Sequence, residues 1–274
     1  MKINFPVIGN ERNLPIYVCG VGVDYPQDDI YRGDGYNHLE FVFFTEGTGE
    51  MGMNDELYQL KPGYGFFMQP GVPHYYRCTG GEWRSWWVCF EGGGAQELLQ
   101  KLNLSEPKIY DLGNTDRLQR IIRRIYNSVE NDKLFGNYYA SSGLYDFILE
   151  FYKLANSFGS IYAEKSNEGI ERLISLIETD YPKKITMKTL CEATHYSEVH
   201  ICRLFKKHLG MRPMEYVNQK RIQEAKLLLH KSYLSIEKIS EMVGIESQSY
   251  FGLLFKRYEG ISPSAYRDMM MHTK

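Results

Sequence analysis

Hydrophobic side chains are spaced differently in the early and later parts of the chain. Up to about residue 90, short runs rich in Val, Phe and Tyr alternate with turns that contain Gly and Pro. Many short strands separated by such turns predict an antiparallel β-sandwich or barrel. The runs are residues 16–18, 39–44, 65–68 and 86–90.

After Gly94 the hydrophobic spacing becomes helical. Five apolar positions follow the i, i+3, i+4, i+7 pattern and predict an amphipathic helix, with Asn114 or Thr115 as its cap. This apolar stripe has two alternative uses: it packs against a second copy of the chain, or it docks onto the β domain of its own chain. A second helix is predicted over residues 144–154. The five positions are Leu118, Ile121, Ile122, Ile125 and Val129.

The last third of the chain contains one sequence unit twice. When residues 197–216 are aligned with residues 247–266, seven of the twenty positions are identical, against roughly one expected from average residue usage. Recurrence at one fixed offset indicates a repeated supersecondary unit. The identical pairs are Ser197/Ser247, Leu204/Leu254, Phe205/Phe255, Lys206/Lys256, Gly210/Gly260, Pro213/Pro263 and Tyr216/Tyr266.

Each copy has the pattern of a helix-turn-helix. A short amphipathic stretch is followed by a tight turn, and then Ser197 or Ser247 stands where a helix N-cap is favoured. In the helix that follows, apolar residues share one face and basic or amide residues share the other. This order is typical of a DNA-reading helix-turn-helix. The first helix of the second copy is predicted to turn Ile236, Ile239, Met242 and Val243 inward.

Charge distinguishes the two ends of the chain, although the whole molecule has a formal net charge of only −2. Residues 1–160 contain 14 Lys and Arg against 20 Asp and Glu, whereas residues 183–274 contain 16 against 9. The tail is therefore basic and the front acidic. A basic tail with helix-turn-helix patterns predicts double-stranded DNA as its partner.

Cysteine usage and hydropathy indicate a reducing compartment. The five cysteines are odd in number and contain no C-x-x-C pair, so free thiols are expected rather than a disulfide framework or a zinc site. The N-terminus lacks the apolar run of a signal peptide, and no stretch approaches ~20 apolar residues. A cytoplasmic protein without a membrane partner is therefore expected.

A series of motif residues runs in order through the C-terminal hundred residues. In the first copy they are Leu204-Phe205-Lys206-Lys207, Gly210, Pro213, Tyr216, Arg221, Ala225 and Leu228-Leu229; in the second they are Ile236, Ile239, Val243-Gly244, Ser249-Tyr250-Phe251, Phe255-Lys256, Gly260, Pro263 and Tyr266-Arg267. Together they resemble the AraC/XylS family of bacterial transcription regulators. The resemblance implies two helix-turn-helix units joined by a long helix over residues 213–230, with recognition helices in successive major-groove turns.

The resemblance also implies which side chains contact DNA. Arg203 is expected to form a bidentate pair of hydrogen bonds with guanine, and Gln248 with adenine; each pair is worth about 1–3 kcal/mol of discrimination against other bases. Lysines on the same helices are expected near phosphates. Leu253 stands where many members carry arginine, so the second unit is expected to have weaker polar readout, while Ile245 in place of phenylalanine affects only packing. The implied DNA-binding residues are Ser197, Val199, His200, Cys202, Arg203, Lys206, Lys207, Ser247, Gln248, Ser249, Gly252, Leu253 and Lys256.

In the front part, Gly65-x4-Pro70-Gly71-x2-His74 resembles the second cupin motif. The resemblance implies a cupin-like sensor for a small effector, expected to be a sugar, held by aromatic and polar side chains. Arg32, Tyr76 and Trp87 match ligand positions of sugar-responsive members, whereas Ser85 replaces a histidine. For any single aromatic residue, core packing is the alternative. The implied effector-binding residues are Tyr17, Arg32, His74, Tyr76, Ser85 and Trp87.

A metal-dependent cupin enzyme is the alternative from another functional class. Such cupins use a His-x-His pair, a Glu and a later His, whereas this chain offers His38, Glu40 and His74 without the second histidine of the pair. His38 and Glu40 are two apart on a predicted strand and point the same way, so a facial-triad site on these three residues stays open. The glycines at 33–35 and 92–94 are not placed as phosphate loops.

The predicted architecture is a multidomain α+β chain. Residues 1–95 are assigned to a cupin-like antiparallel β-barrel, 96–158 to a helical region for dimerisation or packing, 159–167 to a linker and 168–274 to an all-α double helix-turn-helix. The expected protein is a transcription regulator without enzymatic activity or a cofactor. Its expected partners are double-stranded DNA, a small effector, a second copy of the chain and RNA polymerase. A non-sugar effector, or none, stays open.

Overall fold

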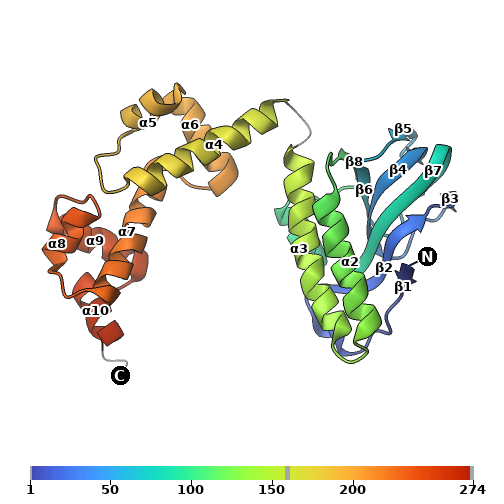
Figure 1. The fold of residues 1–274 in the computed structure, drawn as a ribbon, viewed down its shortest axis with the longest axis horizontal. Coiled ribbons are helices and arrows are strands. Elements are labelled where there is room, and N and C mark those ends of the chain that lie inside the picture. Colours follow the sequence, from blue (N-terminus) through green and yellow to red (C-terminus); the bar gives the residue numbers. More distant parts are fainter. Residues whose placement is uncertain (1, 158–160, 272–274) are drawn as a thin grey trace. The chain divides into compact units, whose positions relative to one another are not determined.

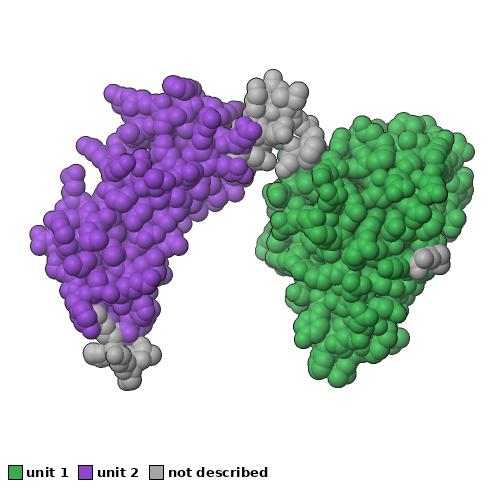
Figure 2. Space-filling model, in the orientation of Figure 1, with its two compact units in different colours: residues 1–163 green, residues 164–274 purple. Residues whose placement is uncertain are grey.

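The computed structural model describes residues 2–157 and 161–271, and the chain divides into two compact units. Residues 1–163 form the first unit and residues 164–274 the second (Figure 2). The predicted linker falls at this division. Its residues 159 and 160 lie outside the described residues, whereas residues 161–167 are not a linker but the first turns of helix α4, Ile161–Asp180.

The first unit contains an antiparallel sheet of eight described strands in the order β1-β2-β7-β4-β6-β8, with β3 paired to β7 and β5 to β4. Each predicted run overlaps one of these strands, which confirms the β fold. Because β8 follows the first helix, the sheet extends beyond residue 95. The strands are β1 (Lys2–Asn4), β2 (Tyr17–Pro26), β3 (Ile30–Arg32), β4 (Leu39–Met53), β5 (Glu56–Leu60), β6 (Tyr64–Met68), β7 (His74–Glu91) and β8 (Lys108–Asp111).

The long strands β4 and β7 pair with each other and separate two hydrophobic clusters. Side chains alternate along a strand, so Phe41 and Phe43 of β4 enter one cluster while Val42 and Phe44 enter the other. The hairpin between β4 and β5 has Asn54 at φ 53° and Asp55 at φ 61°. Two consecutive residues with positive φ are typical of a type I′ turn.

Helices cover one face of this sheet (Figure 1). They are α1 (Ala95–Lys101), α2 (Asp116–Asn131) and α3 (Gly136–Ser157), and a 3₁₀ turn, Asn10–Asn13, follows β1. All five stripe positions of α2 are buried in the cluster that contains Phe41 and Phe43. Of the two uses open to this stripe, docking onto its own β domain is therefore the one observed.

The second unit is entirely helical in its described part. The long helix α7 lies between two helix-turn-helix units, as predicted (Figure 1). Ser197 and Ser247 cap the second helix of each unit, accepting hydrogen bonds from the backbone N–H of His200 and Tyr250. After α4 the helices are α5 (Met187–Thr194), α6 (Glu198–Leu209), α7 (Pro213–Lys231), α8 (Ile236–Met242), α9 (Gln248–Glu259) and α10 (Pro263–Met271).

The turn of the second copy requires glycine. Gly244 has φ 80°, and a Cβ there would lie 2.5 Å from the carbonyl oxygen of Pro182.

The prediction that Met242 points inward is wrong, because its side chain is 42% exposed whereas Ile239 and Val243 are fully buried. Positions i and i+4 lie on one helix face, so Val243 occupies the inward position and Met242 lies at its edge.

None of the five cysteines forms a disulfide. No helix within residues 2–157 and 161–271 has the length and apolar character needed to cross a membrane.

Candidate functional site

The outward face of α6 is the first of two candidate DNA-reading surfaces. The inward stripe of this helix is buried, while Val199 is largely exposed. Nη2 of Arg203 donates a hydrogen bond to Nδ1 of His200 across 3.1 Å. The ring of Tyr196 packs edge-on against His200, with 4.7 Å between the ring centroids. These contacts hold the Arg203 guanidinium on the exposed side, and Cys202 beside it is half-buried.

The corresponding face of α9 is less polar. Gln248 and Ser249 are exposed in the first turn, and Leu253 is 72% exposed. Around Gly252 the space that a side chain would take is open. Tyr250 is 51% exposed beside them and was not predicted as a contact residue. Its position was available from the repeat, since Tyr250 aligns with the outward-facing His200.

Exposed lysines lie beside the outward faces of both α6 and α9. Lys206, Lys207 and Lys256 are exposed in the last turns of α6 and α9. Nζ of Lys206 donates to the carbonyl oxygen of Gly210 across 3.2 Å. Among the described residues no salt bridge joins these three lysines or Arg203 to a carboxylate, whereas lysines of α7 are paired with glutamates. Such unneutralised charge is available to phosphates.

Arg32 is the centre of a polar cluster in the first unit. Its Nη1 lies 2.7 Å from Oε2 of Glu40 and 3.5 Å from Nε2 of His74. Its guanidinium carbon lies 4.1 Å from the ring centroid of Tyr36. The ring of Tyr76 stacks with that of His74, with 6.1 Å between centroids. The pairing of β3 with β7 thus brings three of the six predicted effector residues together.

A hydrogen bond sets the tautomer of His74, and burial sets its protonation state. Its Nδ1–H donates to the carbonyl oxygen of Val72 across 2.7 Å, which leaves Nε2 as an acceptor facing Arg32. Burial lowers the pKa of His74, and Arg32 adds to this effect, whereas the Val72 carbonyl and Glu40 oppose it. The imidazole is therefore neutral in the native state. Burial also raises the pKa of Tyr76, which keeps its hydroxyl protonated.

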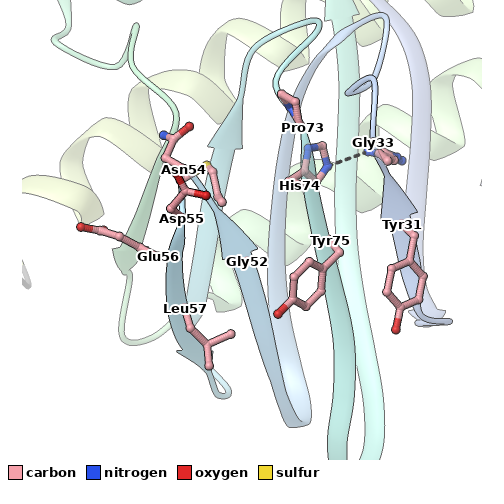
Figure 3. A pocket seen from close by; sticks show the side chains of 12 residues that line it. Tyr31, Gly33, Gly52, Asn54, Asp55, Glu56, Leu57, Pro73, His74 and Tyr75 are labelled. Carbon is pink, nitrogen blue, oxygen red and sulfur yellow. Dashed lines mark hydrogen bonds between the residues drawn. The ribbon is translucent and has the colours of Figure 1, made fainter.

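A cavity of about 720 Å³ opens beside the Arg32–His74 pair. Figure 3 shows Tyr31 and Tyr75 on adjacent strands with His74 nearby. The two tyrosine rings stack with 5.8 Å between their centroids. The β4–β5 hairpin, residues 54–57, lines another side and contributes amide and carboxylate groups. The cavity thus combines aromatic faces with polar anchors, as small-ligand sites do.

The other three predicted effector residues have different partners. Oγ of Ser85, which is fully buried, donates to Oε1 of Gln27 across 2.6 Å. Trp87 lies against Phe5, with 5.7 Å between ring centroids, and a Cβ at Gly22 would lie 2.2 Å from its indole. The Tyr17 hydroxyl donates to Glu91. No sequence signal marks Gln27 or Phe5 for these contacts, because the fold brings them to Ser85 and Trp87 from distant parts of the chain.

The three residues of the possible facial triad are divided between different partners. Glu40 is paired with Arg32, while Nδ1 of His38 lies 2.6 Å from Oε1 of Glu91. In the part of the chain that the structure describes, His38, Glu40 and His74 do not form a cluster of metal-ligating atoms. The Arg32 guanidinium contacts both Glu40 and His74, so a positive group already occupies the place of a cation.

A β-sheet unit with a polar cavity, followed by two helix-turn-helix units, defines a DNA-binding transcription regulator with a ligand-binding domain. The chain belongs to the AraC family of transcription regulators. The AraC-like ligand binding domain matches residues 15–148, and a helix-turn-helix domain matches residues 190–269. The family, the fold class and the DNA-binding function predicted from the sequence are thereby confirmed.

Two relatives resemble the chain over nearly its whole length. The lactose operon transcription activator of Staphylococcus xylosus is 27% identical over 91% of this chain and 90% of that protein. The raffinose operon transcriptional regulatory protein of Pediococcus pentosaceus is 27% identical over 96% of this chain and 93% of that protein. Among solved structures, the C-terminal domain of a two-component response regulator from Fusobacterium nucleatum is 36% identical, covering 36% of this chain and 98% of that chain with a TM-score of 0.36.

Proposed function

We propose that the first unit binds a carbohydrate and that this ligand is an effector of DNA binding rather than a substrate. The observation that carries the proposal is the Arg32–His74 pair, with its hydrogen-bonding edge beside a cavity lined by stacked tyrosines. The names of the two relatives, regulators of a lactose and a raffinose operon, support a sugar.

The cavity offers what a sugar ring requires. Glu40 holds the Arg32 guanidinium, whose remaining N–H groups are donors for hydroxyl oxygens. Tyr31 and Tyr75 offer apolar ring faces for the C–H face of a pyranose. We place Tyr76 behind this site. We propose that three residues on the paired strands β2 and β7 form the inner wall of the effector site. They are Tyr17, Ser85 and Trp87.

Calorimetric titration of the full chain with lactose, raffinose and galactose tests this proposal. Saturable binding of one of them is expected, and Arg32→Gln or Tyr75→Ala should weaken it at least about tenfold, which corresponds to ~1.4 kcal/mol. Tyr233→Ala, an exposed tyrosine of the second unit, is the matched control and should bind like the wild type. Absence of sugar binding, or equal loss in the control, contradicts the proposal. If Trp87→Ala loses sugar affinity and Tyr75→Ala does not, the sugar binds at the inner wall and not against Tyr75.

In the second unit, we propose that α6 and α9 each read bases in the major groove. Their exposed basic side chains support this role, because no salt bridge among the described residues joins Arg203 or the lysines of these helices to a carboxylate. Ser197, Ser247 and His200 are placed at the phosphate side of the helix N-termini, and the lysines on phosphates. The base-contacting residues proposed are Val199, Cys202, Arg203, Gln248, Ser249, Gly252 and Leu253, and the phosphate-contacting lysines are Lys206, Lys207 and Lys256.

We propose that two copies associate through the outer side of α3 and the turn before it. The stripe of α2 is used within its own chain, whereas Phe135, Tyr139 and Leu149 are exposed. Sedimentation analysis should show a dimer that Phe135→Asp or Leu149→Asp weakens. A monomer at all concentrations contradicts the proposal that this surface is a dimer interface.

RNA polymerase is a further proposed partner. The cytoplasm is the proposed location of the protein because the DNA is there.

A further inference from the structure

We propose that Cys19, His38 and Glu91 form a zinc site at one end of the sheet. A thiol sulfur, a ring nitrogen and a carboxylate oxygen, one from each residue, lie within 4.8 Å of one another. These are the three donor types that Zn²⁺ takes from proteins. None of these three residues belongs to the Arg32 cluster, although Tyr36 contacts both Arg32 and His38. Zinc binding by these residues does not require the sugar proposed above.

Strand register explains why the three residues meet. Tyr17 pairs with Glu91 and Val18 with Phe90, but Gly20 then pairs with Cys89, so Cys19 is the extra residue of a β-bulge. A bulge re-aims the side chain of its extra residue and is frequent beside functional sites. Here it places the Cys19 thiol beside the carboxylate at the end of β7, while His38 precedes the neighbouring strand β4.

The distances suit coordination after a small adjustment. Zinc–ligand bonds of about 2.0–2.3 Å place tetrahedral ligand atoms roughly 3.3–3.7 Å apart. Nδ1 of His38 and Oε1 of Glu91 are 2.6 Å apart and hydrogen-bonded, so they must separate by roughly 1 Å as coordination replaces this bond. The side chains of His38 and Glu91 are 33% and 41% exposed. An ion therefore has a route in, and the fourth position is open to water.

Two neighbouring residues orient the proposed ligands. The Tyr17 hydroxyl donates to Oε2 of Glu91 across 2.7 Å, which turns Oε1 toward His38. The ring of Tyr36 packs edge-on against His38, with 5.2 Å between centroids. Such supporting contacts are a regular part of metal sites. A thiolate ligand favours Zn²⁺ over Mg²⁺ and Ca²⁺, which prefer oxygen.

The test is zinc titration of the untagged, metal-stripped full chain, followed by competition with a chelator. One equivalent of Zn²⁺ is expected to bind tightly and to raise the unfolding temperature. Cys19→Ser and His38→Gln should each lower zinc affinity more than about tenfold, the effect seen even for supporting residues. Cys78→Ser, an exposed thiol outside the cluster, is the matched control and should bind like the wild type.

Cobalt provides a second readout that needs no variant. Co²⁺ bound by the wild-type chain should show thiolate-to-metal charge-transfer absorption, which Zn²⁺ then abolishes by displacement. No stoichiometric zinc binding, wild-type affinity in either Cys19→Ser or His38→Gln, equal loss in Cys78→Ser, or a cobalt spectrum without a thiolate band would each overturn the proposal. If Cys19→Ser does not fold, the cobalt spectrum and His38→Gln decide.

Discussion

Arg203 and Lys206 stand three residues apart on α6 but are held in different ways. The guanidinium of Arg203 is fixed by His200, which itself rests on Tyr196. The ammonium group of Lys206 instead bonds to the carbonyl of Gly210 at the end of the helix. A planar, oriented fork is suited to a base edge, and a cation at the helix end is suited to a phosphate.

Substitutions at these two residues should therefore have different signatures. Arg203→Gln is expected to relax preference at one base pair by about 1–3 kcal/mol while binding to unrelated DNA changes little. Lys206→Gln is expected to weaken binding to all sequences alike and to reduce the slope of log K against log salt by about 1. Affinities for a set of single-base operator variants at several salt concentrations measure both effects. The reverse pattern would contradict the assignment.

The burial of His74 predicts how the stability of the folded chain depends on pH. Its pKa is lowered in the folded chain by burial, so protons bind the unfolded chain more readily. Stability from this residue is complete above the unfolded pKa of about 6.5 and is lost as the pH falls from there toward the folded pKa. Urea unfolding between pH 8 and 5 should show a steeper acid-side loss for the wild type than for His74→Gln. Identical slopes would show that His74 remains protonatable in the folded state.

At the residue scale, sequence patterns identify side chains but not their partners. Arg32, His74 and Tyr76 could be selected from motif positions, whereas the contact of Arg32 with Glu40 and Tyr36 depends on how β3 and β4 meet β7. This register is set by pairings distant in sequence. Local spacing therefore does not encode it.

At the scale of secondary-structure elements, each recognition helix begins directly after the serine that the sequence predicts as its N-cap. Ser197 and Ser247 each satisfy a backbone N–H that has no partner within its helix. Ser197→Ala and Ser247→Ala should each lower the free energy of unfolding by about 0.5–2 kcal/mol. Ser249→Ala, exposed inside α9, is the control and should change it by less than about 0.5 kcal/mol. Urea unfolding measures all three, and equal effects would show that capping is not the cause.

Helix α2 was predictable as an amphipathic helix, but its partner was not. Periodicity shows that one face is apolar, and both the β domain and a second chain could cover it. The structure shows burial against the sheet, with Ile122 fully buried.

Ile122→Ala should therefore lower the free energy of unfolding by about 2–5 kcal/mol. Because the lost contacts lie within one chain, this decrease should be the same at low and high protein concentration. Unfolding curves at several concentrations measure it. A loss that grows on dilution would place the stripe at an interface between chains.

At the scale of the whole molecule, the two units differ in how far their sequences predict them. The helical unit follows from local signals: caps, periodicity and an internal repeat all act within a few turns of chain. Strand order in the β unit depends on non-local pairing, and β8 joins the sheet only after a helix has intervened. The pattern therefore predicted β2, β4, β6 and β7 as single strands, but neither the other four strands nor the strand order.

The double helix-turn-helix makes a prediction about the operator that neither unit makes alone. If α6 and α9 read one duplex in successive major-groove turns, the base pairs that each helix specifies should lie about one helical turn, or ~10 bp, apart. Compared with the sequences selected by the wild-type chain, those selected by Arg203→Gln and by Gln248→Ala should each lose preference at one position, and these two positions should have that separation. Leu253→Arg should add a preference near the position affected by Gln248→Ala, because arginine can bond to guanine where leucine offers only apolar contact. Loss of the same base pairs in both variants, or no loss in one, would mean that only one helix reads sequence while the other supplies general affinity for DNA.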